Sequence, residues 1–196
     1  MLLENYYYYY INVIPHNVCD DIIKFASQHQ EVLGATGNIK EKDLQEDNHL
    51  VEENKKHRNS YITWLDEQWI YNEIQPFIQE ANINAKWNFE WDWTEPAQFT
   101  KYKLNQYYNW HVDQDIEHDD NGKIRKLSCS VQLSHPEEYE GGDLQFQTPH
   151  GEFTANEIKP KGSICIFPSF VTHRVTPVTS GIRQSLVMWN RGKPFR

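Results

Sequence analysis

From Lys86 onward the chain is a succession of short strand-like runs, and this feature limits the folds it can adopt most strongly. Apolar and aromatic residues alternate with polar ones at a period of two, as in a strand with one buried face. Turn glycines separate the runs, and no gap between them is long enough for a helix. Because parallel strands need such helical crossovers, an antiparallel sandwich or jelly roll is predicted.

The first of these runs is predicted at residues 87–93, where four aromatic residues alternate with polar ones. This alternation fits either a ligand-stacking platform or a buried sheet face, and the buried face is favoured. The strands predicted to follow it are residues 97–104, 107–111, 126–134, 143–148, 163–167, 171–176 and 183–190.

An aromatic strand at residues 6–13 and two helices are predicted before this region. Residues 17–28 have a helical apolar stripe, and Asn17 is the expected N-cap. A second stripe covers residues 64–79, and Pro76 should kink that helix or end it early.

The segment between the two helices, residues 31–57, is polar and predicts a mobile loop or a weak helix. The overall prediction is a mainly β fold with flanking helices and a double-stranded β-helix (jelly-roll) core. We expect one domain over residues 1–196. Its N-terminal strand and supporting helices take up residues 1–85, and the core takes up residues 86–196.

Composition narrows the class of partner and compartment. A net charge of −9 without a basic stripe disfavours binding to nucleic acid phosphates. Three cysteines are too few for a disulfide framework, which favours a reducing compartment and a cytoplasmic protein. We also expect no signal peptide and no membrane association, because no apolar run approaches a membrane-spanning length.

The candidate chemistry begins with His111-Val112-Asp113. Residues i and i+2 of a strand project from the same face, so these two side chains can reach one metal ion. The motif alone is weak, and a second one occurs at His118-Asp119-Asp120. His111 ends an aromatic strand-like run, whereas His118 lies in a polar run that ends in a turn signal. We therefore take the first pair as the candidate and His118 as a solvated loop residue.

Two later residues can complete a site. His173, on another predicted strand, can add a second imidazole, which gives the two-His-one-carboxylate set of non-haem Fe(II) oxygenases. Arg183 follows ten residues later, beyond a turn, and its planar guanidinium suits a carboxylate held in a partly dry pocket. Taken alone, Arg183 would be read as a surface residue paired with an acid.

These residues lie within motifs that resemble the 2-oxoglutarate/Fe(II) dioxygenases, specifically the prolyl 4-hydroxylase-like branch with its PKHD-type hydroxylases. The resemblance extends from about residue 58 to residue 189. Its motifs are Arg58-x-Ser60, Tyr102-x-x-x-Gln106-x-Tyr108-x-x-His111-x-Asp113, Gly141-Gly142-Asp143-Leu144, Phe167-Pro168-Ser169 and His173-Arg174-Val175-Thr176-Pro177 through Gly181-x-Arg183. The chain departs from many relatives at Asn105, where they have Gly, and at Arg183, where many prolyl 4-hydroxylases have Lys.

The resemblance implies a jelly roll that binds Fe(II) through His111, Asp113 and His173. It further implies that 2-oxoglutarate chelates the iron through its keto acid end and pairs its far carboxylate with Arg183. Tyr102 matches a family tyrosine that assists by hydrogen bonding, although a core aromatic would look the same. O2 is the co-substrate, and ascorbate is expected as a reductant.

The activity implied is hydroxylation of an amino-acid side chain, with peptidyl proline as the expected target and succinate and CO2 as products. A peptide or protein substrate is expected. The alternatives are a 2-oxoglutarate oxygenase acting on a free amino acid, another small molecule or a nucleic acid, and a non-catalytic jelly-roll binding protein.

Overall fold

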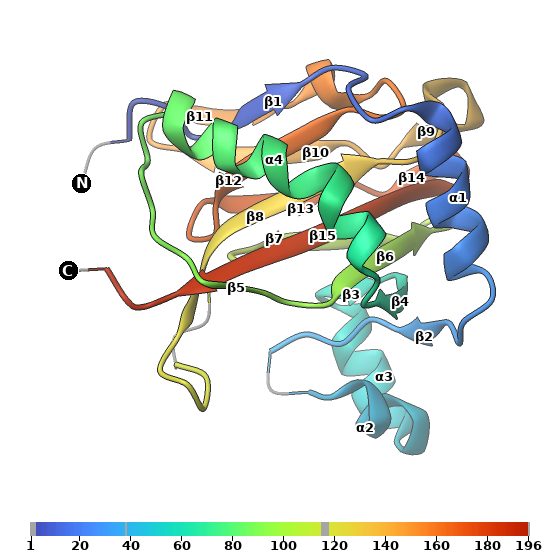
Figure 1. Ribbon diagram of the computed structural model, residues 1–196. Coiled ribbons are helices and arrows are strands. Elements are labelled where there is room, and N and C mark those ends of the chain that lie inside the picture. Colours follow the sequence, from blue (N-terminus) through green and yellow to red (C-terminus); the bar gives the residue numbers. More distant parts are fainter. Residues whose placement is uncertain (1–2, 38, 115–117, 196) are drawn as a thin grey trace.

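The computed structural model describes residues 3–37, 39–114 and 118–195, which form mainly antiparallel strands (Figure 1). The strands of the larger sheet are β1 (Tyr8–Tyr10), β2 (Val32–Leu33), β4 (Tyr61–Leu65), β5 (Trp93–Thr94), β6 (Ala97–Tyr102), β8 (Ile124–Gln132), β12 (Ile164–Pro168) and β15 (Arg183–Gly192). Those of the smaller sheet are β3 (Arg58–Asn59), β7 (Tyr107–His111), β10 (Leu144–Thr148), β11 (Gly151–Thr154) and β13 (Thr172–Val175). Two further strands, β9 (Tyr139–Gly141) and β14 (Val178–Gly181), pair with each other.

Neighbouring strands in both sheets are mostly distant in sequence. The larger sheet has the order β1-β12-β8-β15-β6-β4-β2, with β5 beside β15, and the smaller one has the order β11-β10-β13-β7-β3. Each pairing within the described ranges is antiparallel. The prediction of a mainly β jelly roll with flanking helices is therefore confirmed.

The helices α1 (His16–Ala26) and α4 (Gln68–Asn84) cover one face of the larger sheet (Figure 1). Two shorter helices, α2 (Glu41–Glu46) and α3 (Asn48–Lys55), lie beside β2 and β3. In α4 the residues Ile70, Ile74 and Ile78 recur every four positions and are fully buried against the sheet. Burying each of these side chains contributes roughly 1.5–3 kcal/mol. In the described part of the chain no helix is long and apolar enough to span a membrane.

A second, smaller core lies between the two sheets. It draws Tyr102 and Phe167 from the larger sheet and Leu144, Phe146 and Val175 from the smaller one. These side chains hold the two sheets together along one side of the space between them. The polar residues described below line the rest of that space.

The predicted helix boundaries are wrong in three respects. Pro15, not Asn17, occupies the N-cap of α1. The helix predicted from residue 64 begins at Gln68, because Trp64 belongs to β4. It also continues through Pro76 to its end at Asn84. Pro76 is exposed, so water can satisfy the carbonyl group that loses its intrahelical donor.

The strand predicted at residues 87–93 is also wrong, because only its last residue lies in a strand, β5. Lys86 and Asn88 have positive φ angles of 60° and 51°, which interrupt an extended path. Trp87 and Phe89 are nevertheless buried. The alternation therefore predicted burial correctly in the first half of the segment, without the strand.

The polar segment at residues 31–57 is ordered by hydrogen bonds. It contains β2, α2 and α3, so the prediction of a mobile loop or a weak helix missed most of its structure. Asn54 is fully buried, donates from Nδ2 to the carbonyls of Gly34 and Arg58, and accepts from Thr36 at Oδ1. One amide side chain thus joins three parts of a segment that has little apolar surface.

Candidate metal and co-substrate site

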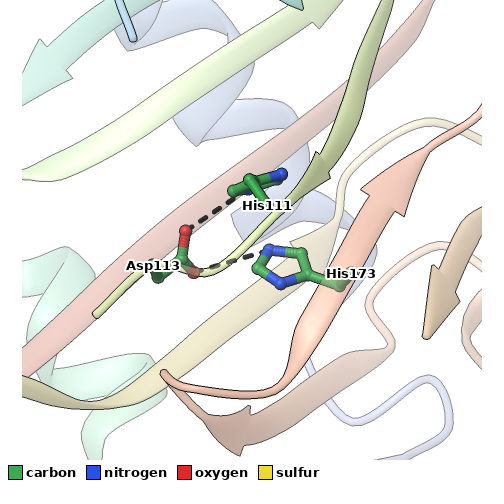
Figure 2. A group of neighbouring side chains, drawn as sticks. All are labelled: His111, Asp113 and His173. Carbon is green, nitrogen blue, oxygen red and sulfur yellow. Dashed lines mark ion pairs between the residues drawn. The ribbon is translucent and has the colours of Figure 1, made fainter. Parts of the chain in front are cut away.

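His111, Asp113 and His173 converge beside β7 and β13 (Figure 2). His111 ends β7 and pairs directly with His173 of β13, and the two ring centroids are 4.1 Å apart. The Asp113 carboxylate lies 3.4 Å from His111 Nε2 and 3.5 Å from His173 Nε2. The three ligand atoms all lie within 4.8 Å of one another, so a single metal ion can contact all of them.

Asp113 reaches this position from beyond the end of its strand. The sequence placed it two residues along a continuous strand, but β7 ends at His111. The backbone N–H of Asp113 instead donates to the carbonyl of Ser169 at 2.9 Å. Ser169 is fully buried and hydrogen-bonds through its hydroxyl to Ser128. A buried loop after β12 therefore fixes the carboxylate.

Backbone carbonyls orient both imidazoles. His111 Nδ1 lies 2.7 Å from the Asn109 carbonyl, and His173 Nδ1 lies 3.0 Å from the Val171 carbonyl. Each carbonyl requires an N–H at Nδ1, so in a neutral ring Nε2 presents a lone pair. Two lone pairs and a carboxylate then face one another, an arrangement that is repulsive unless a cation lies between them. The donor set therefore fits a bound divalent metal ion.

The pKa values of Asp113 and His173 keep these two residues in the protonation states that bind a metal ion. Burial acts to raise the pKa of Asp113, but the nearby imidazoles of His173 and His111 hold it well below its usual range. Burial and the neighbouring His111 lower the pKa of His173 to about 4, while Asp113 opposes this shift. At neutral pH Asp113 is ionised and His173 is neutral, the forms in which both bind metals.

A cavity between the sheets connects these three residues to Arg183, the first residue of β15. Arg183 is only 2% exposed. Its Nη1 lies 3.4 Å from the Ser185 hydroxyl, and its guanidinium lies 5.7 Å from the centre of the Tyr102 ring. Among the described residues, no carboxylate forms an ion pair with it. An unpaired buried charge is costly, so the cavity fits a carboxylate ligand that would pair with Arg183.

The Gly141-Gly142 motif makes room for this arginine. Gly142 has a φ of 60°, and a Cβ atom there would lie 2.9 Å from Cδ of Arg183. At Gly141 a Cβ atom would lie 2.2 Å from the Pro177 carbonyl oxygen. Both positions therefore need glycine, and the glycine at 142 leaves space for the Arg183 side chain.

Two tyrosines form part of the cavity wall. Tyr102 pairs with Arg183 across β6 and β15, and no described residue hydrogen-bonds its hydroxyl group. Burial raises the pKa of Tyr102 in spite of the nearby Arg58 and Arg183, so the hydroxyl stays protonated and can donate. Tyr108 stacks on the His111 ring at a centroid distance of 3.5 Å, which restricts the orientation of that imidazole.

Arg58 is a cavity residue to which the sequence analysis gave no role. It is buried, donates to the Ser60 hydroxyl and to Gln98 Oε1 at 2.7 Å each, and lies over the Tyr108 ring. Its sequence signal was the Arg58-x-Ser60 motif, which the first of these hydrogen bonds explains. Other polar lining residues that were missed are Thr100, Ser130 and Ser185.

A groove of about 810 Å³ lies beside the cavity. The two share lining residues, among them Asp113 and Trp189. Residues 35–37, Ile39 and Glu41 line the groove as well, so the polar segment before α2 forms part of its wall. His118 and Asp119 of the second motif also border the groove, but His118 is exposed, as predicted, and lies outside the cluster of three ligands.

Comparison with known proteins agrees with the fold and with the donor set. Residues 97–191 match the 2OG-Fe(II) oxygenase superfamily. A PKHD-type hydroxylase of Xylella fastidiosa strain M12 is 38% identical over 104 residues, which are 49% of this chain and 44% of the relative. The match therefore spans less than half the length of that curated relative. The resemblance to the 2OG-Fe(II) oxygenase superfamily therefore covers residues 97–191, just under half of the chain.

Solved structures resemble the whole chain. The viral collagen prolyl hydroxylase of Paramecium Bursaria Chlorella virus-1, in its 2OG complex, has a TM-score of 0.67 and 25% identity, with 96% of this chain and 97% of that chain covered. A Trichoplax adhaerens prolyl hydroxylase in complex with a hypoxia inducible factor oxygen degradation domain peptide fragment has a TM-score of 0.64 and 12% identity. That alignment covers 95% and 84% of the two chains and reflects a shared fold.

Proposed function

We propose that this protein is an Fe(II)- and 2-oxoglutarate-dependent dioxygenase that hydroxylates prolyl side chains in a peptide or protein. The observation that carries the proposal is one cavity that contains both a two-His-one-carboxylate cluster and a buried arginine without a carboxylate partner. Neither feature explains the other. A metal-chelating keto acid with a second carboxylate accounts for both.

The roles of the residues follow from this geometry. His111, Asp113 and His173 would hold Fe(II), and Arg183 would pair with the far carboxylate of 2-oxoglutarate while the keto acid end meets the metal. Bound Fe(II) supplies the chemistry that splits O2, with one oxygen atom entering the succinate formed and the other a substrate C–H bond, as CO2 leaves. Tyr102 would donate a hydrogen bond to the bound dicarboxylate. The apolar wall of the cavity, including Phe167 and Val175, keeps bulk water away from it.

The groove supports a peptide as the substrate. It is larger than the space a free amino acid needs, and it borders Asp113, so an extended chain can lie along it with one residue at the metal. Proline is favoured because two of the solved structures with a similar fold are prolyl hydroxylases. The three cysteines are unpaired and buried, which supports a cytoplasmic location. Ascorbate is the expected reductant.

The first test replaces a metal ligand. Asp113→Ala should lower Fe(II) stoichiometry and reduce succinate formation by more than about 100-fold, because even changes outside the ligand shell commonly cost 10–100-fold. Asp120→Ala is the matched control, since Asp120 is exposed and lies outside the ligand cluster. Succinate release and metal content report the outcome. Full activity in Asp113→Ala would remove this residue from the ligand set.

The second test identifies the substrate. The protein is incubated with Fe(II), 2-oxoglutarate, O2 and ascorbate, together with proline-containing peptides, free proline or a methylated oligonucleotide. We expect a gain of one oxygen atom on a prolyl residue of a peptide, measured by mass spectrometry. Oxidation of free proline or of the oligonucleotide alone would keep the enzyme class and reject the peptide substrate.

A further inference from the structure

A second pocket lies apart from the metal cavity, under the C-terminal end of β15. It measures about 610 Å³, and its lining comes from the linker that joins α4 to β5, from β8 and from the C-terminal residues 192–195. Its walls include the aromatic side chains of Phe89, Trp91 and Phe195. None of the residues that line this pocket also lines the metal cavity.

The polar residue of interest in this pocket is Lys126, and a β-bulge presents it there. On β15, Asn190 pairs with Leu127 and the next residue, Arg191, pairs with Arg125, so Lys126 is the extra residue of β8. A bulge redirects the side chain that it carries. Arg125 lines the groove beside the metal cavity and Leu127 faces the core, whereas Lys126 lines the second pocket.

Lys126 is buried without an anionic partner. It is 5% exposed, and in the described part of the chain no oxygen atom hydrogen-bonds its ammonium group. Its contact is the ring of Phe195, whose centre lies 3.9 Å from Nζ. Lys161 is equally buried and provides the comparison, because the Asp20 carboxylate pairs with it.

The contact with the Phe195 ring does not by itself compensate for the burial of the Lys126 ammonium group. Removing an ammonium group from water costs more free energy than a cation–π contact returns. Burial accordingly lowers the pKa of Lys126, although the charge of Glu90 opposes the shift. Glu90 is exposed, and the other nearby acid, Asp92, is paired with Lys123 at 2.8 Å. A ligand that carries its own carboxylate would supply the missing acceptor.

We propose that this pocket is a second ligand site, which takes a small carboxylate bearing an aromatic group. The carboxylate pairs with Lys126, and the ring packs between Phe89, Trp91 and Phe195. These three side chains provide apolar surface for the ring, while the ammonium group selects a charged head group over a neutral one. The site is independent of the proposed reaction, since it shares no lining residue with the metal cavity.

Phenylacetate is a suitable probe, with phenylacetamide as its neutral counterpart. Binding is followed by isothermal titration calorimetry and by the NMR signal of the Trp91 indole N–H, assigned with Trp91→Phe. Saturating 2-oxoglutarate and metal are kept present under anaerobic conditions, so that the metal cavity is already filled. We expect phenylacetate to bind with a Kd on the order of 1 mM. Phenylacetamide should bind at least about 10-fold more weakly, the equivalent of 1.4 kcal/mol.

Two lysine variants test the assignment. Lys126→Met keeps the length and apolar surface of the side chain and should weaken phenylacetate binding at least about 10-fold. Lys193→Met removes an exposed charge from the same pocket and should leave the affinity within about 2-fold. Equal affinity of wild-type protein for both probes, or unchanged affinity in Lys126→Met, would overturn the proposal. Phenylacetate binding that appeared only when 2-oxoglutarate was left out would also overturn it, because the probe would then occupy the metal cavity.

Discussion

The two ends of β15 carry buried arginines in opposite surroundings. At its beginning, Arg183 is 2% exposed and has no carboxylate partner among the described residues. Near its other end, Arg191 is 9% exposed and its Nη1 lies 3.0 Å from Glu95, whose carboxylate also forms two hydrogen bonds of 2.6 Å with Arg125. The protein supplies the counter-charge at one end and leaves it out at the other. A buried charge without a protein partner therefore marks the end of the strand at which an anionic ligand belongs.

Along β15, the largest expected effect comes from replacing Arg183, which lies at the end of this strand where the buried arginine has no carboxylate partner among the described residues. Arg183→Ala should raise the 2-oxoglutarate concentration needed for half-maximal turnover by about 100-fold, or 2.7 kcal/mol, because a bidentate charged hydrogen bond is lost. Fe(II) binding and the free energy of unfolding should not fall, since the side chain removed has no protein counter-charge. The 2-oxoglutarate requirement of Arg183→Lys should lie between those of the wild type and Arg183→Ala, because an ammonium group donates to a carboxylate from a single point.

The 2-oxoglutarate dependence of succinate formation measures this effect. Added 2-oxoglutarate should also raise the thermal midpoint of the metal-loaded wild type but not that of Arg183→Ala. Arg174→Ala is the matched control, because this arginine follows His173 directly but bonds to Gln145 and lies over Trp110, outside the cavity. An unchanged 2-oxoglutarate requirement in Arg183→Ala would assign the carboxylate clamp to another residue.

The positions of His111, His173 and Arg183 were largely predictable from the sequence, because strands have a regular period. His111 and His173 lie on strands that the period-two pattern identified, and direct pairing of β7 with β13 brings them together. Arg183 was located by its distance beyond a turn, and it begins β15 as expected. Their roles as metal and co-substrate ligands stay a prediction. Asn105, in the turn between β6 and β7, has a φ of 62°, a backbone conformation that Gly and Asn adopt more readily than most residues.

What sequence reasoning missed depends on single hydrogen bonds between distant residues. Asp113 is held by Ser169, and the segment around α2 and α3 is held by Asn54, and neither contact has a periodic signal. The paired charges of Glu95, Arg125 and Arg191 likewise come from three separate strands or linkers. The period of the apolar residues indicates which face of a strand or helix is buried. It does not indicate which pairs of polar side chains form hydrogen bonds.

A smaller effect is expected at the paired end of β15. Glu95→Gln removes a carboxylate that Arg125 and Arg191 share, and it should lower the free energy of unfolding by about 2 kcal/mol. Urea unfolding at pH 7 measures the change, and Glu73→Gln, an exposed position on α4, should stay within about 0.5 kcal/mol of wild type. If Glu95→Gln were as stable as Glu73→Gln, the pairing of this end would be structurally unimportant and the contrast with Arg183 would fail.

The smallest effect is expected at a more exposed ion pair, between Glu31 and Lys101, which ties the segment before β2 to β6. Lys103 also contributes, with its Nζ 3.4 Å from Glu31. Both side chains of the main pair are more exposed than those around Glu95. Glu31→Gln should therefore cost only about 0.5–1 kcal/mol. Hydrogen exchange should rise locally at residues 31–37, which include part of the groove wall.

The pH dependence of this last effect separates electrostatics from packing. Burial acts to raise the pKa of Glu31, but Lys101 and Lys103 more than offset this and lower it below its usual value. A lowered pKa in the folded state contributes stability above the unfolded value of about 4.3, and that stability is lost as the pH falls through the folded value. The stability difference between wild type and Glu31→Gln should thus be largest near pH 7 and become smaller as the pH falls below the folded pKa of Glu31. A difference that did not become smaller with falling pH would mean that the carboxylate acts through its packing, and the exposed pair would then not belong in the same series as Glu95 and Arg183.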